Sequence, residues 1–158
     1  MELPAVRGAR DHRAVHRIGW RADGVSGEAI LPAGWTPAKG YTNGVACGAG
    51  RTVYVGGQIG WDGQQRAVST GFVDQFDQAL ANVVAVVEAA GGAPTDLVKM
   101  TVYVTDIEAY RGSLRAVGGC WRARLGKHFP AMALVGVTAL VEPWAMVEIE
   151  AIAHIREG

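Results

Sequence analysis

The sequence predicts an α+β fold, in which a β-sheet carries two helices on one of its faces. Two observations support this prediction: an amphipathic helix pattern over residues 72–90, and strand-like alternation of apolar and polar residues over 98–105. A helix with one apolar stripe must bury that stripe, and a half-buried strand offers an apolar face to cover it. Helices packed on one face of a sheet satisfy both patterns.

The chain of 158 residues is most simply one domain. Hydrophobic residues make up 49% and charged residues 19%, which is typical of a folded globular protein. The 15 basic and 15 acidic residues balance, so the overall charge does not indicate a nucleic-acid or membrane partner. No apolar run approaches the ~20 residues of a membrane span and no signal-peptide pattern opens the sequence, which favours a cytoplasmic location.

Residues 1–29 are expected to form a basic N-terminal extension, and residues 30–158 the folded domain. Five arginines and two histidines lie in the first 21 residues. Such a stretch can contact nucleic acid. No run of aromatic residues accompanies the charge, so an arm that packs loosely or continues a strand is the favoured interpretation.

The first strands are expected at residues 45–47 and 52–55, paired as a β-hairpin around Gly48-Ala-Gly50. Gly56 and Gly57 then end the second strand or bulge it.

A helix follows over residues 72–90. Gly91 and Gly92 can adopt the left-handed backbone conformation that ends a helix, and Pro94 follows where the helix cannot continue. Its stripe consists of Phe72, Phe76, Ala79, Leu80, Val83, Val87 and Ala90.

The alternating strand over 98–105 comes next, and Asp106 can cap a second helix over about 107–125. Two further strands, near 131–140 and 146–155, are expected to close the chain as a hairpin. The sheet face without helices still needs cover, for which another copy of the chain is expected. On the second helix the residues expected to face inward are Ile107, Tyr110, Leu114, Val117 and Trp121.

No metal site is indicated. The four histidines contain no i, i+4 helical pair in the folded region. Cys47 and Cys120 form no spaced ligand pair, and each is expected to be a small buried thiol.

Glu148 and Glu150 lie two residues apart on a predicted strand and therefore point to the same side. Two carboxylates on one face repel each other, so one can be held with a raised pKa for proton transfer. Alternatively, each bonds to an arginine, a lysine or a backbone donor at a subunit boundary. The residues leave both interpretations open.

Several polar and aromatic residues have a binding and a structural interpretation. Gln58 is a binding donor or satisfies a buried turn. Trp61 is a pocket wall or an interface anchor. Tyr41 presents its phenol to a ligand or simply packs. Gln78 and Asn82, one helical turn apart, are expected to bond to each other.

Six separated motifs between about residues 30 and 155 resemble one known family, the Rid (reactive intermediate deaminase) family of YjgF type, also called L-PSP endoribonucleases. The motifs are Lys39-Gly-Tyr41, Gly57-Gln-Ile59, Gln78 with Asn82, Val98-Lys-Met-Thr-Val-Tyr-Val-Thr-Asp106, Phe129-Pro-Ala131 and Glu148-Ile-Glu-Ala-Ile-Ala153.

The resemblance implies a chorismate-mutase-like fold with a mixed sheet, assembled as a homotrimer with clefts between subunits. It also implies hydrolysis of enamines and imines such as 2-aminoacrylate to a keto acid and ammonia, with no cofactor. In such members an arginine after Pro-Ala grips the substrate carboxylate, and a tyrosine and the first glutamate of Glu-Ile-Glu complete the cleft.

By this resemblance the tyrosine corresponds to Tyr41 and the glutamate to Glu148, the expected catalytic residues. Gly56 stands where many deaminases have serine, and Leu134 where many have cysteine. The arginine position holds Met132. The expected substrate-binding residues are Gly57, Gln58, Trp61, Met132 and Leu134.

Methionine at position 132 should change the substrate. A guanidinium makes two charge-assisted hydrogen bonds to a carboxylate, whereas a thioether makes none. Loss of both bonds weakens binding of a carboxylated imine by roughly two to four orders of magnitude if no other group replaces them. Arg122, Arg124, Lys127 and His128 are candidate replacements. Met132 beside Trp61 and Leu134 instead suggests an apolar pocket for an aromatic or uncharged ligand.

Three functions follow as hypotheses. The first is hydrolysis of an imine, an enamine or a related labile metabolite other than the carboxylated 2-aminoacrylate type. The second is a non-catalytic small-molecule-binding trimer. The third is ribonuclease activity, which is least favoured because a neutral domain attracts phosphate little outside its N-terminal arm.

Overall fold

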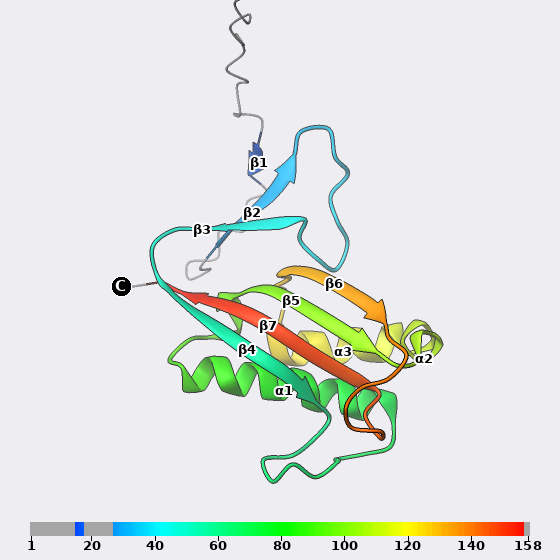
Figure 1. The fold of residues 1–158 in the computed structure, drawn as a ribbon. Coiled ribbons are helices and arrows are strands. Elements are labelled where there is room, and N and C mark those ends of the chain that lie inside the picture. The colour runs from blue at the N-terminus through cyan, green and yellow to red at the C-terminus, as the bar shows by residue number, and fades with distance from the viewer. Residues whose placement is uncertain (1–14, 18–26, 157–158) are drawn as a thin grey trace, which may run out of the picture.

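The structure is a computed structural model that describes residues 15–17 and 27–156. Its main feature is a mixed four-stranded sheet with the strand order β4-β7-β5-β6 (Figure 1). These strands are β4 (Arg51–Ile59), β5 (Leu97–Val104), β6 (Ala131–Gly136) and β7 (Val147–Ile155). Strand β7 runs antiparallel to both of its neighbours, whereas β5 and β6 are parallel.

Helices cover one face of this sheet. The long α1 (Phe72–Ala89) and α3 (Leu114–Leu125) lie against it, and the short α2 (Ile107–Gly112) precedes α3 (Figure 1). A 3-10 turn, η1 (Pro94–Asp96), leads from α1 into β5. The core forms where the apolar stripe of α1 meets the inner side chains of β5 and β7. The predicted α+β fold, the first helix and the alternating strand are confirmed.

A smaller antiparallel sheet lies beside the main one. It consists of β1 (Val15–Arg17), β2 (Gly27–Pro32) and β3 (Gly44–Cys47), in that order. The segment just before β3 is tied to the start of β6, because the Thr42 N–H donates to the Pro130 carbonyl oxygen at 3.1 Å.

Both predicted hairpins are wrong. Strand β3 pairs with β2 rather than with β4, and β6 and β7 do not pair because β7 lies between β4 and β5. Alternation of apolar residues shows that a strand is half-buried, but it does not show which strand is its partner. At Gly50 the chain passes close to the end of β7, where a Cβ would lie 2.5 Å from the Ile155 carbonyl oxygen.

The second helix is predicted to be continuous but breaks at Ser113 into α2 and α3. Gly112 and Ser113 are weaker helix formers than their neighbours, which favours a break there. Asp106 caps α2 as predicted, with its Oδ1 accepting two first-turn N–H groups at 2.9 Å each. Leu114, predicted to face inward, is instead 56% exposed.

The prediction of two buried thiols is wrong for Cys47, which is exposed near the end of β3, while Cys120 is half-buried. The predicted bulge after Val55 is confirmed by a register shift between Val55 and Gln58. Within the described ranges, no helix has the length and apolar character needed to cross a membrane.

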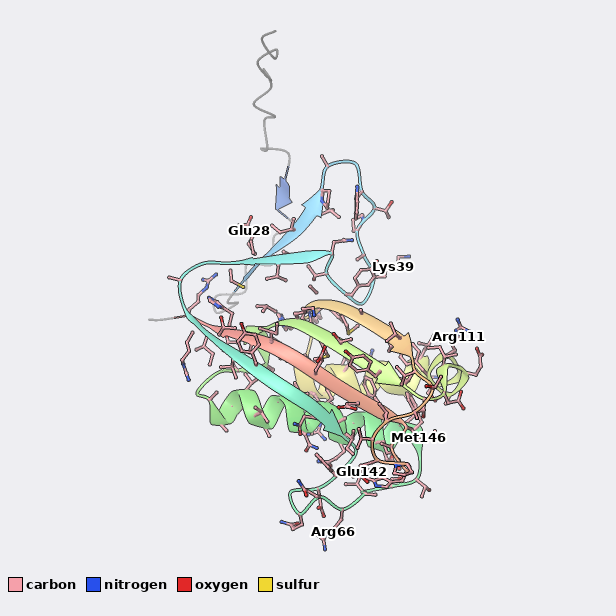
Figure 2. All side chains as sticks on the ribbon, viewed as in Figure 1. Glu28, Lys39, Arg66, Arg111, Glu142 and Met146 are labelled. Carbon is pink, nitrogen blue, oxygen red and sulfur yellow. The ribbon has the colours of Figure 1, made fainter. Side chains whose placement is uncertain are left out.

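A buried amide on α1 holds together the loops that enter and leave the sheet. Gln75 is fully buried, and its Nε2 donates to the carbonyl oxygens of Ser69 at 2.9 Å and Trp144 at 3.2 Å. Its Oε1 accepts the Met146 N–H at 2.8 Å. Met146 lies just before β7 (Figure 2). Gly60 allows this close packing, since a Cβ there would lie 2.6 Å from the Gln75 Cβ. Gln75 therefore fixes the start of β7 relative to α1.

Replacing Gln75 by methionine, which has a similar volume and no amide, should lower the free energy of unfolding by about 2–4 kcal/mol, because buried backbone groups lose their partners. Urea denaturation measures the change. The matched control is Gln78→Met, a half-buried position with one side-chain bond, which should cost under about 1 kcal/mol. Equal losses for the two variants would contradict the role given to Gln75.

Candidate functional site

The two glutamates of β7 lie on the sheet face that the helices leave open. Glu148 is paired with Tyr103 of β5, and Glu150 with Thr101. The intervening Ile149 is fully buried on the helix side. The prediction that the two carboxylates share one side is confirmed.

Glu148 lies directly over the bulge in β4. A Cβ on Gly57 would be 1.8 Å from the Glu148 Oε1, so any side chain at this position would occupy the place of the carboxylate. The bulge leaves Gly56 and Gly57 without partners on β7, between the pairs made by Val55 and Gln58. Within the described residues no side chain or backbone group hydrogen-bonds the Glu148 carboxylate, which is half-buried. It is therefore available to a ligand or to water.

Glu150 has a partner that the sequence does not reveal. Its Oε1 accepts a hydrogen bond from the Tyr103 hydroxyl at 3.0 Å. This bond raises the pKa of Tyr103, with burial and the negative charge of Glu150 acting in the same direction. Among the described residues, Glu150 is thus bonded to a phenol of the neighbouring strand. A raised carboxyl pKa for proton transfer and pairing at a subunit boundary both stay predictions. Tyr103 was missed because only the register of β5 against β7 brings it to Glu150.

A depression of about 290 Å³ lies on the same open face. Its lining includes Tyr54 and Gly56 of β4, Lys99 and Thr101 of β5, and Glu150. The open face thus carries both carboxylates, an exposed lysine and two phenols.

Gln58 and Trp61 are held at the end of β4. The Gln58 Nε2 donates to the Gly56 carbonyl oxygen at 3.3 Å across the bulge. Asn82 of α1 donates to the carbonyl oxygens of Ile59 at 3.2 Å and Trp61 at 2.9 Å. It also accepts from the Gln78 Nε2 at 2.8 Å, which confirms the predicted Gln78–Asn82 pair. This amide pair fixes the segment that follows the bulge.

Met132 and Leu134 lie on the other side of the sheet. They are paired with Met100 and Val102 of β5, whose side chains are buried under the helices. Both pack against the core at the edge of the sheet, and both line a groove between β6 and α3. Trp61 is not in the lining of that groove, whose aromatic residues are those of α1, α2, α3 and Phe129. The structure therefore divides the predicted site residues between two faces of one sheet.

Tyr41 belongs to the β6 side of this division. It is 43% exposed and precedes Thr42, which is bonded to Pro130 and bridged to Ala131. Its ring lines a shallow cavity of about 270 Å³ that Phe129 also lines. Tyr41 therefore lies beside the start of β6, the strand that carries Met132.

The candidate replacements for the missing arginine have different surroundings. Arg124 makes two hydrogen bonds to Asp77, at 3.1 and 2.6 Å, and lowers the pKa of that carboxyl. His128 contacts the Leu97 carbonyl oxygen at 2.6 Å, and burial lowers its pKa. Arg122 is exposed, and its Nη1 lies 3.4 Å from where a Cβ on Gly118 would be.

No group of three or more metal-ligating side chains is found among residues 15–17 and 27–156.

Comparison with known proteins shows one family. Residues 33–155 match the family described as endoribonuclease L-PSP. A 2-iminobutanoate/2-iminopropanoate deaminase of Salmonella typhimurium is 38% identical over 119 residues, covering 73% of this chain and 88% of the relative. The human protein of the same name is 36% identical over 104 residues, covering 65% and 72%.

Solved structures show the same fold. A Rid-family protein of unknown function from Yersinia pestis superimposes with a TM-score of 0.73 at 29% identity, covering 82% of this chain and 99% of that one. RidA from a Psychrobacter species has a TM-score of 0.58 at 36% identity, covering 75% and 93%. The fold implied by the resemblance is therefore confirmed.

The bond between Tyr103 and Glu150 can be tested by spectroscopic titration. The tyrosine absorbance near 295 nm should show one phenol that ionises at higher pH than the others, and Tyr103→Phe should remove it. Glu150→Gln should return its pKa toward the usual value, because the charged acceptor is lost. The folded state holds the Tyr103 hydroxyl proton more tightly than the unfolded state does. The bond to Glu150 therefore stabilises the fold below the ordinary tyrosine pKa, and this stabilisation is lost as the pH rises through the raised pKa of Tyr103. A titration curve unchanged by Glu150→Gln would show that the bond does not form.

Proposed function

For this chain, which belongs to the endoribonuclease L-PSP (Rid) family, we propose hydrolysis of an imine or enamine to a carbonyl compound and ammonia. The relatives at 36–38% identity that are named 2-iminobutanoate/2-iminopropanoate deaminases support this class of reaction. The observation that carries the proposal is the Glu148 carboxylate, which lies over the bulge at Gly57 with no hydrogen-bond partner in the described residues.

Glu148 is suited to act as a general base. In the first step, its carboxylate takes a proton from water while the water oxygen bonds to the imine carbon. The C=N π electrons move to nitrogen, which takes up the proton that Glu148 has removed from water, so the carboxylate is regenerated. In the second step, the hydroxyl proton of the carbinolamine passes to nitrogen, the C–N bond breaks, and C=O and ammonia form. Atoms balance with water as the only co-reactant, and nothing is oxidised or reduced.

The bulge supplies the polar surroundings for this step. Gly56 and Gly57 have no partners on β7, so their backbone groups can face a bound molecule instead of completing the sheet. We assign to the backbone near Gly57 and Gln58 the polarisation of the reacting C–N group. Donors fixed in advance are effective because they need little reorganisation during the reaction.

The division of the site residues supports a homotrimer with clefts between subunits. Tyr41, Met132 and Leu134 lie toward the β6 edge, whereas Glu148 and Gly57 lie on the open face of the same sheet. A single cleft that uses both sets needs a second copy of the chain. In the proposed assembly Tyr41 orients the substrate, and the open face is covered by neighbouring copies.

The substrate of this reaction differs from 2-aminoacrylate. Met132 offers no charge to a carboxylate at the β6 edge, and its surroundings are apolar. An imine with a larger apolar or aromatic body fits such surroundings better than a small carboxylated imine.

Glu148→Gln should lower the turnover of the preferred imine by about 10²–10⁴-fold, the usual contribution of a general base. Imines generated in situ by an amine or amino-acid oxidase can be followed by semicarbazide trapping, because faster hydrolysis lowers the initial rate of semicarbazone formation. The matched control is Glu150→Gln, on the same face, which should keep most of the activity. We expect the imine of an aralkylamine to be hydrolysed faster than 2-iminobutanoate. Turnover that Glu148→Gln leaves intact would overturn the proposal.

Gly57→Ala should abolish turnover without unfolding the protein. The new methyl group would take the place of the Glu148 Oε1, and the flexible end of that side chain would have to move away. Gly56→Ala is the matched control, since nothing lies within 4 Å of a Cβ at that position. Thermal melting should show similar stability for both variants, and only Gly57→Ala should be inactive. Equal activity of the two variants would show that the position of the carboxylate is not needed.

A further inference from the structure

The open face carries a lysine that the proposed chemistry at Glu148 does not use. Lys99 is exposed on β5 and lies opposite Ile152 of β7. The next residue, Met100, is fully buried on the helix side, so the alternation of the strand directs Lys99 to the open face. No carboxylate in the described part of the chain forms an ion pair with Lys99. Its ammonium group is therefore available to an anion.

A hydrogen bond to the neighbouring strand explains why Lys99 has no ion pair. Glu150 is two residues from Ile152 and is therefore the diagonal neighbour of Lys99, within reach of a long side chain. The Glu150 carboxylate instead accepts the Tyr103 hydroxyl at 3.0 Å. On β5, Thr101 lies opposite Glu150, with Lys99 on one side of it and Tyr103 on the other. The bond to Tyr103 thus draws the carboxylate away from the lysine.

The depression of about 290 Å³ on this face lies between Lys99 and the bulge. Lys99 and Thr101 line it on β5, and Gly56 lines it on β4 (Figure 1). Gly56 is next to Gly57, over which the Glu148 carboxylate lies. In the proposed trimer a neighbouring copy covers this face, so the depression belongs to the same cleft as Glu148.

The strand register sets the separation between the cation and the base. Ile152, opposite Lys99, is four residues from Glu148, which is roughly 13 Å along β7. The flexible four-carbon stem of the lysine bridges part of this separation. An anionic group that meets Lys99 while the imine carbon is at Glu148 must therefore be several bonds from that carbon. A carboxylate on the carbon of the imine itself, as in 2-iminobutanoate, is too close to it.

The lining between the two ends suits an aromatic ring. Tyr54 and Ile152 are paired across β4 and β7, and both line the depression. Tyr54 is 78% exposed, so its ring is open to a bound molecule. Since a cavity of roughly 150 Å³ holds benzene, the depression has room for a ring that carries a further group.

We propose that the substrate of the Glu148 reaction is an imine whose carboxylate is remote from the reacting carbon, and that Lys99 binds this carboxylate. The Tyr103–Glu150 bond keeps the lysine unpaired for this purpose. An example is 4-(iminomethyl)benzoate, which reacts with water to give 4-formylbenzoate and ammonia. Lys99 thereby supplies the charge that is absent at Met132. This inference rests on the proposed hydrolysis and names its substrate class.

The test compares two imines of similar size and shape. An amine oxidase generates them from 4-(aminomethyl)benzoate and 4-(aminomethyl)benzamide, and semicarbazide trapping follows their hydrolysis at equal rates of release. The rates without the protein give the intrinsic reactivity of each imine. After this correction, kcat/KM for the carboxylate should exceed kcat/KM for the amide by roughly tenfold, the value of one charge-assisted hydrogen bond.

Variants identify the group that causes the preference. Lys99→Gln should remove it, because the charge is lost. Lys127→Gln makes the same charge change just after α3, a helix on the other side of the sheet, and should keep it (Figure 1). Tyr103→Phe should weaken the preference, since Glu150 is then free to pair with Lys99. Adding Glu150→Gln to Tyr103→Phe should restore it.

A binding measurement separates this inference from the proposed reaction. Saturation-transfer NMR uses 4-(hydroxymethyl)benzoate and 4-(hydroxymethyl)benzamide, which contain no imine. The benzoate should bind more tightly, and Lys99→Gln should remove the difference. If no imine is hydrolysed while this difference is observed, the proposed reaction fails and the carboxylate site stands.

Three results overturn the inference: equal turnover of the two imines by the unmodified protein, a preference that survives Lys99→Gln, or a preference that Tyr103→Phe leaves intact. If the two imines are hydrolysed equally and Glu148→Gln abolishes both activities, the proposed reaction stands and the role of Lys99 fails.

Discussion

The register of β7 between β4 and β5 is the constraint on which the rest of the structure depends. Val147, Ile149 and Ala153 are fully buried on the helix side, so a slip of one residue would expose them and bury the carboxylates between them. Because β7 is hydrogen-bonded along both edges, the same register places Glu148 over Gly57 and fixes which β5 residue lies beside it. Burial of the core and geometry of the candidate site therefore come from one set of pairings.

Two amides of α1 extend this constraint to the chain segments around the site. Gln75 bonds to the backbone that leads into β7, and Asn82 bonds to the carbonyl oxygens at the end of β4. Both amides donate to backbone carbonyl oxygens, so α1, whose apolar stripe packs in the core, also sets the start of β7 and the end of β4. Buried amides of this kind stabilise one arrangement strongly, because any other arrangement leaves polar groups unpaired.

The two faces of the sheet differ in chemistry. The open face carries carboxylates and phenols over a bulge, which suits proton transfer, while the helix side has an apolar groove along β6. Met132 belongs to the second face, where its side chain packs against the core beside β6. The same family fold thus offers a polar and an apolar surface separated by the thickness of one sheet.

The sequence by itself determined what depends on nearby residues: helix α1, strand β5, the cap at Asp106, the Gln78–Asn82 pair and the shared side of the two glutamates. The six motifs also identified the family. Only the tertiary structure decided which strands pair, which face each candidate residue occupies, and that Tyr103 is the partner of Glu150. Alternation gives the side of a residue within its own strand. Strand pairing decides which face of the sheet that side forms and which residue lies opposite. The paired strands are far apart in the chain, so no local sequence pattern specifies their pairing.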